Sequence, residues 1–76
     1  MISPAQIRAA RGLLDWSMEI LAQESGVAKR SLVRIEAGAV EPQARSLQNI
    51  QNALERAGIR FLPDDGVAKP GSTTDS

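Results

Sequence analysis

Apolar residues recur at helical spacing over most of the first 58 positions of the chain. They repeat every three to four residues, the spacing that places side chains on one face of an α-helix. The four stripes consist of Ile7, Ala10 and Leu14; of Leu21 and Ala22; of Leu32 and Ile35; and of Leu47, Ile50, Leu54 and Ala57. The pattern predicts an all-α fold in which four short helices share one core.

Residues with capping and turn chemistry fall between these stripes. Ser3 and Gln6 flank a proline in the arrangement of an N-terminal capping box, and Ser17 can cap a second helix. Gly26 indicates a tight turn, because glycine takes left-handed backbone conformations without steric cost. Gly38 is expected to end the third helix. The second and third helices are therefore short and closely linked.

The chain changes character after residue 58. Ile59–Leu62 carries β-favouring side chains and is followed by turn residues, so a short strand is expected over 59–65. Residues 66–76 are small and polar and are predicted to form a disordered tail. Because a lone strand leaves its backbone groups unpaired, we expect it to pair with the same strand of a second copy. The residues of that dimer interface would be Ile59, Phe61 and Leu62.

The length and composition of the chain exclude several classes of function. With 76 residues, the chain has room for one domain and one modest core. It contains no cysteine and no histidine, which removes disulfides, zinc fingers and histidine acid–base catalysis. We therefore expect no metal, no cofactor and no enzyme activity.

Hydropathy gives no sign of a membrane segment. No apolar run approaches the roughly 18–20 residues that span a bilayer. The first residues lack the continuous apolar core of a signal peptide. A cytoplasmic protein with no membrane partner is expected.

The formal net charge is zero, but the charges are unevenly distributed. Between Ser25 and Ile35 there is no acidic residue, while Lys29, Arg30 and Arg34 supply three positive charges. At 100° per residue, Leu32 defines the inward side of this helix. Arg30, Val33 and Arg34 then point outward, with Lys29 nearer the edge.

This outward face carries the side-chain types that recognise bases. Arginine and lysine donate to guanine O6 and N7, and an apolar side chain such as Val33 contacts a thymine methyl. The alternative is a solvated face without a ligand, which a basic stripe on an amphipathic helix usually is. The tight turn and the short preceding helix favour DNA recognition.

The segment Ser17–Gly38 resembles the helix-turn-helix of the lambda-repressor-like family, also called the XRE family. Like that family, it has Leu-Ala in the first helix, Gly-Val at the turn and Glu-x-Gly at the end of the second. The resemblance extends over about residues 3–58. It implies a DNA-binding domain over 1–58, with the helix-turn-helix at 17–38, in a bundle of four or five short helices followed by a short C-terminal strand.

The resemblance also assigns roles to individual residues. It places Lys29, Arg30 and Arg34 at base edges, the same three that the helical wheel selects. It implies contacts of Ser17, Ser31 and Arg45 with the DNA backbone, although Arg45 also fits a free surface arginine. It further implies an ion pair between Arg11 and Glu36, and the alternative is two separate surface charges.

Three positions depart from the family pattern. Met18 stands where a phosphate-binding glutamine is usual, and Ala28 stands where Ser or Thr would cap the second helix of the motif. Ile20 replaces a residue that is commonly polar. We expect Met18 and Ile20 to add to the core, as Trp16 does; the alternative is an apolar patch for a partner protein.

The function that the resemblance implies is sequence-specific transcription regulation. Relatives of this size bind double-stranded DNA as homodimers on palindromic operators, and control of the chain's own promoter is one expectation. One alternative within the same class is an antitoxin that also binds a toxin. An alternative from another class is a protein-interaction module that has lost DNA binding.

Overall fold

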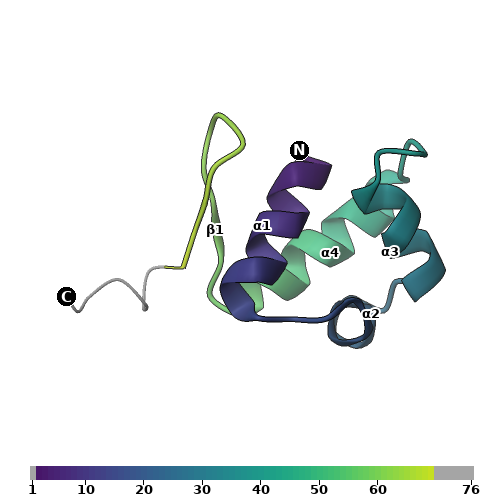
Figure 1. Ribbon diagram of the computed structural model, residues 1–76, viewed down its shortest axis with the longest axis horizontal. Coiled ribbons are helices and arrows are strands. Elements are labelled where there is room, and N and C mark those ends of the chain that lie inside the picture. The colour runs from purple at the N-terminus through teal and green to yellow at the C-terminus, as the bar shows by residue number, and fades with distance from the viewer. Residues whose placement is uncertain (1, 70–76) are drawn as a thin grey trace.

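The structure, a computed structural model, describes residues 2–69. Its elements are α1 (Pro4–Leu14), α2 (Met18–Ser25), α3 (Lys29–Glu36), α4 (Ala44–Arg56), β1 (Arg60–Phe61) and β2 (Val67–Ala68). Helices α1 and α4 occupy the middle of the molecule, with α3 towards one end of its long axis and the two strands at the other (Figure 1). The expected all-α bundle of four helices is confirmed for the described part of the chain.

The apolar stripes predicted from the sequence converge on one core. Its completely buried large side chains are Ile7, Leu21, Leu32, Ile50 and Leu54, which come from all four helices. Three of the predicted stripe residues, Leu14, Ala22 and Ala57, are half-buried. Because each helix buries only one face, the opposite face of each short helix is left to solvent.

The apolar residues around the start of α2 divide between core and surface. Trp16 and Met18 are half-buried and pack against the core. Ile20 does not, and its side chain is 37% exposed. The expectation that Ile20 adds to the core was therefore wrong, because the inward side of α2 is taken by Leu21 and Ser25.

The two strands form a hairpin within the chain. β1 pairs antiparallel with β2, with Arg60 opposite Ala68 and Phe61 opposite Val67. The chain reverses at Asp64 and Asp65, both of which have positive φ angles (64° and 63°).

The hairpin differs from the sequence predictions for the tail and for Ile59. Residues Val67 and Ala68 belonged to the expected tail, yet they supply the strand that pairs with β1. Ile59 was expected at a dimer interface, but it is only 3% exposed and belongs to the core of its own chain. The rest of the expected tail, residues 70–76, lies outside the described residues.

Gln6 attaches the hairpin to the first turn of α1. Its Oε1 accepts the Ser3 N–H at 2.9 Å, and the Ser3 hydroxyl accepts the Gln6 N–H at 3.2 Å, which completes the capping box. Its Nε2 donates to the carbonyls of Leu62 (3.1 Å) and Gly66 (3.0 Å). A buried amide, 4% exposed, thus has its polar groups satisfied by both the helix and the hairpin.

Candidate nucleic-acid interface

A tight turn joins α2 to α3. The Ser17 hydroxyl caps α2 by accepting the Ile20 N–H at 3.2 Å. At the other end, Gly26 takes a left-handed conformation with φ 75°, and the Ser25 hydroxyl accepts the Val27 N–H at 3.1 Å. The chain therefore turns within a few residues, and α3 begins at Lys29.

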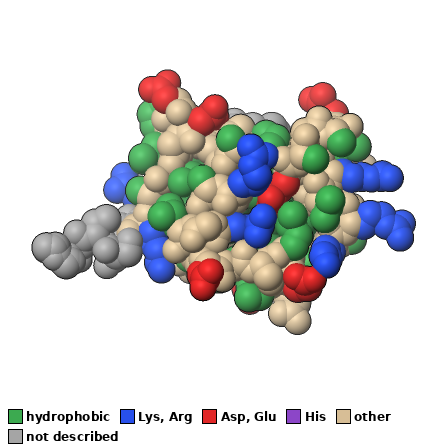
Figure 2. All heavy atoms as spheres, in the orientation of Figure 1, with side chains coloured by type: hydrophobic (Ala, Val, Ile, Leu, Met, Phe, Trp, Pro, Cys, Tyr) green, Lys and Arg blue, Asp and Glu red, His purple; other side chains and the backbone are tan. Residues whose placement is uncertain are grey.

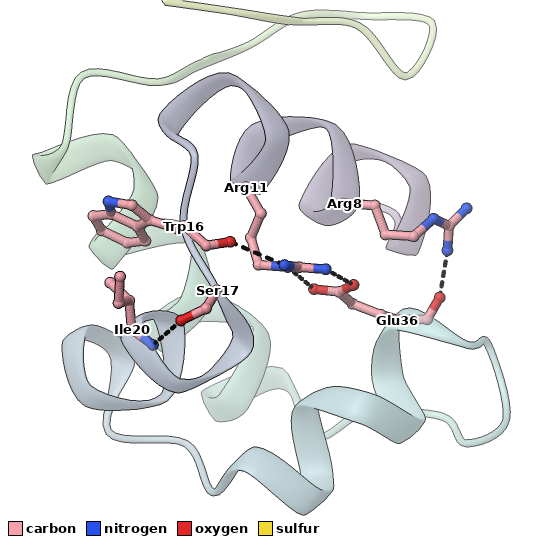
Figure 3. A network of polar contacts seen from close by, with 6 residues as sticks. All are labelled: Arg8, Arg11, Trp16, Ser17, Ile20 and Glu36. Atoms are coloured by element: carbon pink, nitrogen blue, oxygen red, sulfur yellow. Dashed lines mark hydrogen bonds and ion pairs between the residues drawn. The ribbon is translucent and has the colours of Figure 1, made fainter.

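A bidentate ion pair attaches the end of α3 to α1. Arg11 Nε and Nη2 donate to the two carboxylate oxygens of Glu36 at 2.7 and 2.9 Å, and Arg11 Nη1 donates to the Trp16 carbonyl at 3.0 Å (Figure 3). The Glu36 side chain is only 5% exposed. Its hydrogen bonds raise the pKa of Arg11 above the ordinary value. The structure thus brings these residues together as one pair rather than as separate surface charges.

Arg8 adds a second contact between the same two helices. Its guanidinium donates to the backbone carbonyl of Glu36 (Figure 3), which is one of the carbonyls left without a helical partner at the end of α3. Sequence analysis missed this contact, because an arginine on a solvent-facing helix position gives no sign of a partner 28 residues away. Arg8 and Arg11 together hold the C-terminal end of α3 against α1.

The outward face of α3 carries the predicted base-reading side chains. Arg30 and Arg34 are exposed, and Val33 between them is 48% exposed. Neither guanidinium group makes a hydrogen bond or ion pair within residues 2–69. Figure 2 shows basic side chains projecting from the end of the molecule where α3 lies. The face is therefore positively charged and free to accept a ligand.

Lys29 differs from the two arginines, because it has a partner in the protein. Its Nζ forms an ion pair with Glu19 Oε2 in the first turn of α2. The hydrogen bond from Lys29 is the main reason that the pKa of Glu19 is lowered. Both side chains remain more than half exposed. The pair is located between the two helices of the motif, at the edge of the α3 face.

The comparison with known families agrees with this geometry. A helix-turn-helix family profile matches residues 7–58, which include all four helices except the first turn of α1. The chain belongs to the helix-turn-helix family. It is of the lambda-repressor-like, or XRE, type, a family of DNA-binding regulators. No curated protein matches the chain significantly in sequence.

Beside the helix-turn-helix, a shallow groove runs between α3 and the start of α4. It measures about 280 Å³, and its wall includes Ser31, Arg34, Gln43 and Ser46. Arg45 is exposed in the first turn of α4 and makes no hydrogen bond or ion pair among the described residues. Of the predicted backbone-contacting residues, Ser31 lines this groove, Arg45 lies in the first turn of α4, and Ser17 lies at the start of α2.

Two helices of the helix-turn-helix domain begin without a side-chain cap. At the N-cap of α3 stands Ala28, which cannot accept a hydrogen bond, and Gln43 makes none at the N-cap of α4. Their first backbone N–H groups therefore have no side-chain acceptor. Both helix starts carry the positive end of the helix dipole.

The described residues offer little for other chemistry. They contain no group of three or more acidic, histidine or cysteine side chains that could hold a metal ion. Within the same part of the chain, none of the helices has the length and apolar character needed to cross a bilayer.

Proposed function

We propose that this protein is a sequence-specific transcription regulator that reads base edges in the DNA major groove with α3. Arg30 and Arg34 would donate to guanine, and Val33 would contact a thymine methyl, with Lys29 at the edge of the same face. The observation that carries the proposal is the exposed, unpartnered pair of arginines on the second helix of a helix-turn-helix.

Backbone contacts would position α3 in the groove. Ser31 lines the groove beside α3, Arg45 is exposed in the first turn of α4, and the uncapped starts of α3 and α4 offer N–H donors to phosphate oxygens. Ser17 would add a contact at the start of α2. Met18 supplies none, because a thioether has no N–H or O–H to donate to a phosphate oxygen. The proposed clamp therefore depends more on α4 than on α2.

Binding as a homodimer to a palindromic operator is part of the proposal, because one recognition helix reads too few base pairs for useful specificity. Leu62 is 38% exposed on the hairpin and remains available for such an interface. The hairpin and α3 lie towards opposite ends of the molecule, however (Figure 1). In a dimer joined through the hairpins, the recognition helices would therefore lie away from the interface, and the angle between the two copies would set the spacing of the half-sites.

The test is a selection of bound duplexes from a random library, followed by an affinity measurement on the selected sequence. The protein should enrich an inverted repeat, and Arg30→Ala with Arg34→Ala should abolish the preference while leaving the helical circular dichroism unchanged. The spacing of the enriched repeat reports the dimer geometry. Binding to the DNA upstream of the gene that encodes this chain would support control of its own promoter in the cytoplasm. Failure to enrich any sequence at low salt would refute the proposal.

A second candidate function is binding of a protein partner such as a toxin. It is supported by the exposed Ile20, which lies beside the half-buried Trp16 in Figure 3. Interaction surfaces are marked by contiguous apolar patches, which Ile20 and Trp16 would form together. If a partner binds there, Ile20→Gln should weaken that complex with little effect on DNA affinity, because the substitution adds no charge. An unchanged complex would exclude this surface.

A further inference from the structure

Glu19 places a carboxylate at the start of α2, next to the α3 face. It lies in the first turn of α2 and accepts a hydrogen bond from Lys29 Nζ, which is the main reason that the pKa of Glu19 is lowered. An ammonium group and a helix N-terminus are also groups that a DNA phosphate would use. The carboxylate therefore occupies the position of an anion on the surface proposed to bind DNA.

This ion pair has little to contribute to folding. The side chains of Lys29 and Glu19 are 54% and 65% exposed, and pairs exposed to that degree add little to stability. Arg30 and Arg34, by contrast, have no acidic neighbour bonded to them in the described part of the chain. Of the three basic residues predicted to contact bases, Lys29 alone is neutralised by an acid of its own chain within that part.

We propose that Glu19 acts as an internal anion that competes with DNA phosphates for Lys29 and for the start of α2. This inference rests on the proposed DNA-binding function and adds a residue that limits affinity. Non-specific binding depends almost entirely on phosphate contacts, so a carboxylate at this position lowers it at every sequence. The protein would thereby avoid being held on random DNA despite the positive α3 face.

Competition for Lys29 predicts a specific change in the DNA affinity of Lys29 variants. In the wild-type protein, removing the Lys29 charge should cost less DNA affinity than removing the Arg30 charge, because Lys29 must first leave Glu19. Once Glu19 is neutral, Lys29 is free, and the two removals should cost about the same. A general effect of net charge predicts no such change in the ranking.

The experiment measures binding of the full chain to a labelled random-sequence duplex by fluorescence anisotropy between about 20 and 300 mM NaCl. Glu19→Gln should raise affinity about threefold or more at the lowest salt and steepen the slope of log K against log [salt] by about one. Glu24→Gln is the matched control, because Glu24 is an exposed acid at the far end of the same helix. Lys29→Gln and Arg30→Gln are compared in the wild-type and Glu19→Gln backgrounds.

The outcomes distinguish the proposed role of Glu19 from DNA binding itself. A gain for Glu19→Gln well above that for Glu24→Gln, together with the changed ranking of Lys29 and Arg30, supports the inference. Equal gains for the two glutamate variants would overturn it, since net charge alone would then explain both. Wild-type binding with no gain for Glu19→Gln would overturn it while leaving DNA binding intact. Absence of DNA binding by every variant would overturn the proposed function as well.

Discussion

The guanidinium of Arg11 contacts both carboxylate oxygens of Glu36, at 2.7 and 2.9 Å, across 25 residues of sequence. The two residues belong to α1 and to the last position of α3. Their pairing therefore sets the orientation of the proposed recognition helix relative to the rest of the bundle. Within the pair, the Glu36 side chain is much more buried than that of Arg11. Removing Arg11 should therefore destabilise the protein more than removing Glu36.

Arg11→Met should destabilise the protein by about 3 kcal/mol, because it leaves the Glu36 carboxylate buried without a partner. Glu36→Leu should cost less, since Arg11 retains partial exposure and can turn its guanidinium towards water. The double variant should recover most of the stability lost in Arg11→Met. Urea unfolding followed by circular dichroism measures all three.

The exposed pair of Lys29 and Glu19 provides the control for this prediction. Lys29→Met should leave the urea midpoint nearly unchanged, since its partner lies in solvent. If Lys29→Met lost as much stability as Arg11→Met, the burial of Glu36 could not explain the effect of Arg11→Met.

Arg30→Ala and Arg34→Ala should each weaken binding to the selected operator by about tenfold or more, because each removes a proposed bidentate base contact. Binding to random-sequence DNA should fall much less. The measurement is fluorescence anisotropy with both duplexes at the same salt concentration.

Arg60→Ala is the matched control for these two variants. Arg60 carries the same charge and is also exposed, but it lies on the hairpin, away from α3. An equal loss of operator binding for Arg60→Ala would show that overall charge, rather than the α3 face, determines affinity.

Gln6→Ala should loosen the hairpin, because it removes both hydrogen bonds to the carbonyls of Leu62 and Gly66. The expected loss of stability is about 1–3 kcal/mol, since two carbonyls lose a donor and the capping box is broken. Hydrogen exchange should accelerate most at the hairpin amide of Leu62, which bonds Gly66. Gln48→Ala, which breaks only an exposed contact with Asn52, should leave the hairpin unchanged.

Ala28→Ser should stabilise the protein by about 1 kcal/mol, because the residue already has extended backbone angles (φ −59°, ψ 141°) at the uncapped start of α3. The expected result is a rise of several degrees in the thermal midpoint. Ala37→Ser, at the other end of α3, is the control and should give no gain. A fall in the midpoint for Ala28→Ser would mean that the hydroxyl cannot reach the helix N–H groups.

Features encoded by local spacing could be predicted from the sequence. The helices followed from apolar periodicity and from caps such as the Ser3–Gln6 box. The exposure of Arg30, Val33 and Arg34 followed from the position of Leu32, because the faces of one helix have a fixed relation to one another.

Apart from the Arg11–Glu36 pair, which the family resemblance implied, the contacts that depend on tertiary pairing were missed. Glu19 and Lys29 are ten residues apart on two different helices, so no helical spacing connects them. The hairpin was missed for another reason: the Asp-Asp-Gly turn was interpreted as the end of the strand. The turn instead brings a second, very short strand back onto the first, and two residues carry too little pattern to reveal it.

The contacts of Gln6 also bear on the order in which the domain forms during synthesis. The amide lies in α1, and the two carbonyls that it binds follow 56 and 60 residues later in the chain. Contacts of such long sequence separation form late and slow the final folding step. A nascent chain that has reached only residue 58 therefore already contains α3 but lacks both carbonyls that Gln6 binds. Completion of these contacts during synthesis thus depends on translation of the hairpin.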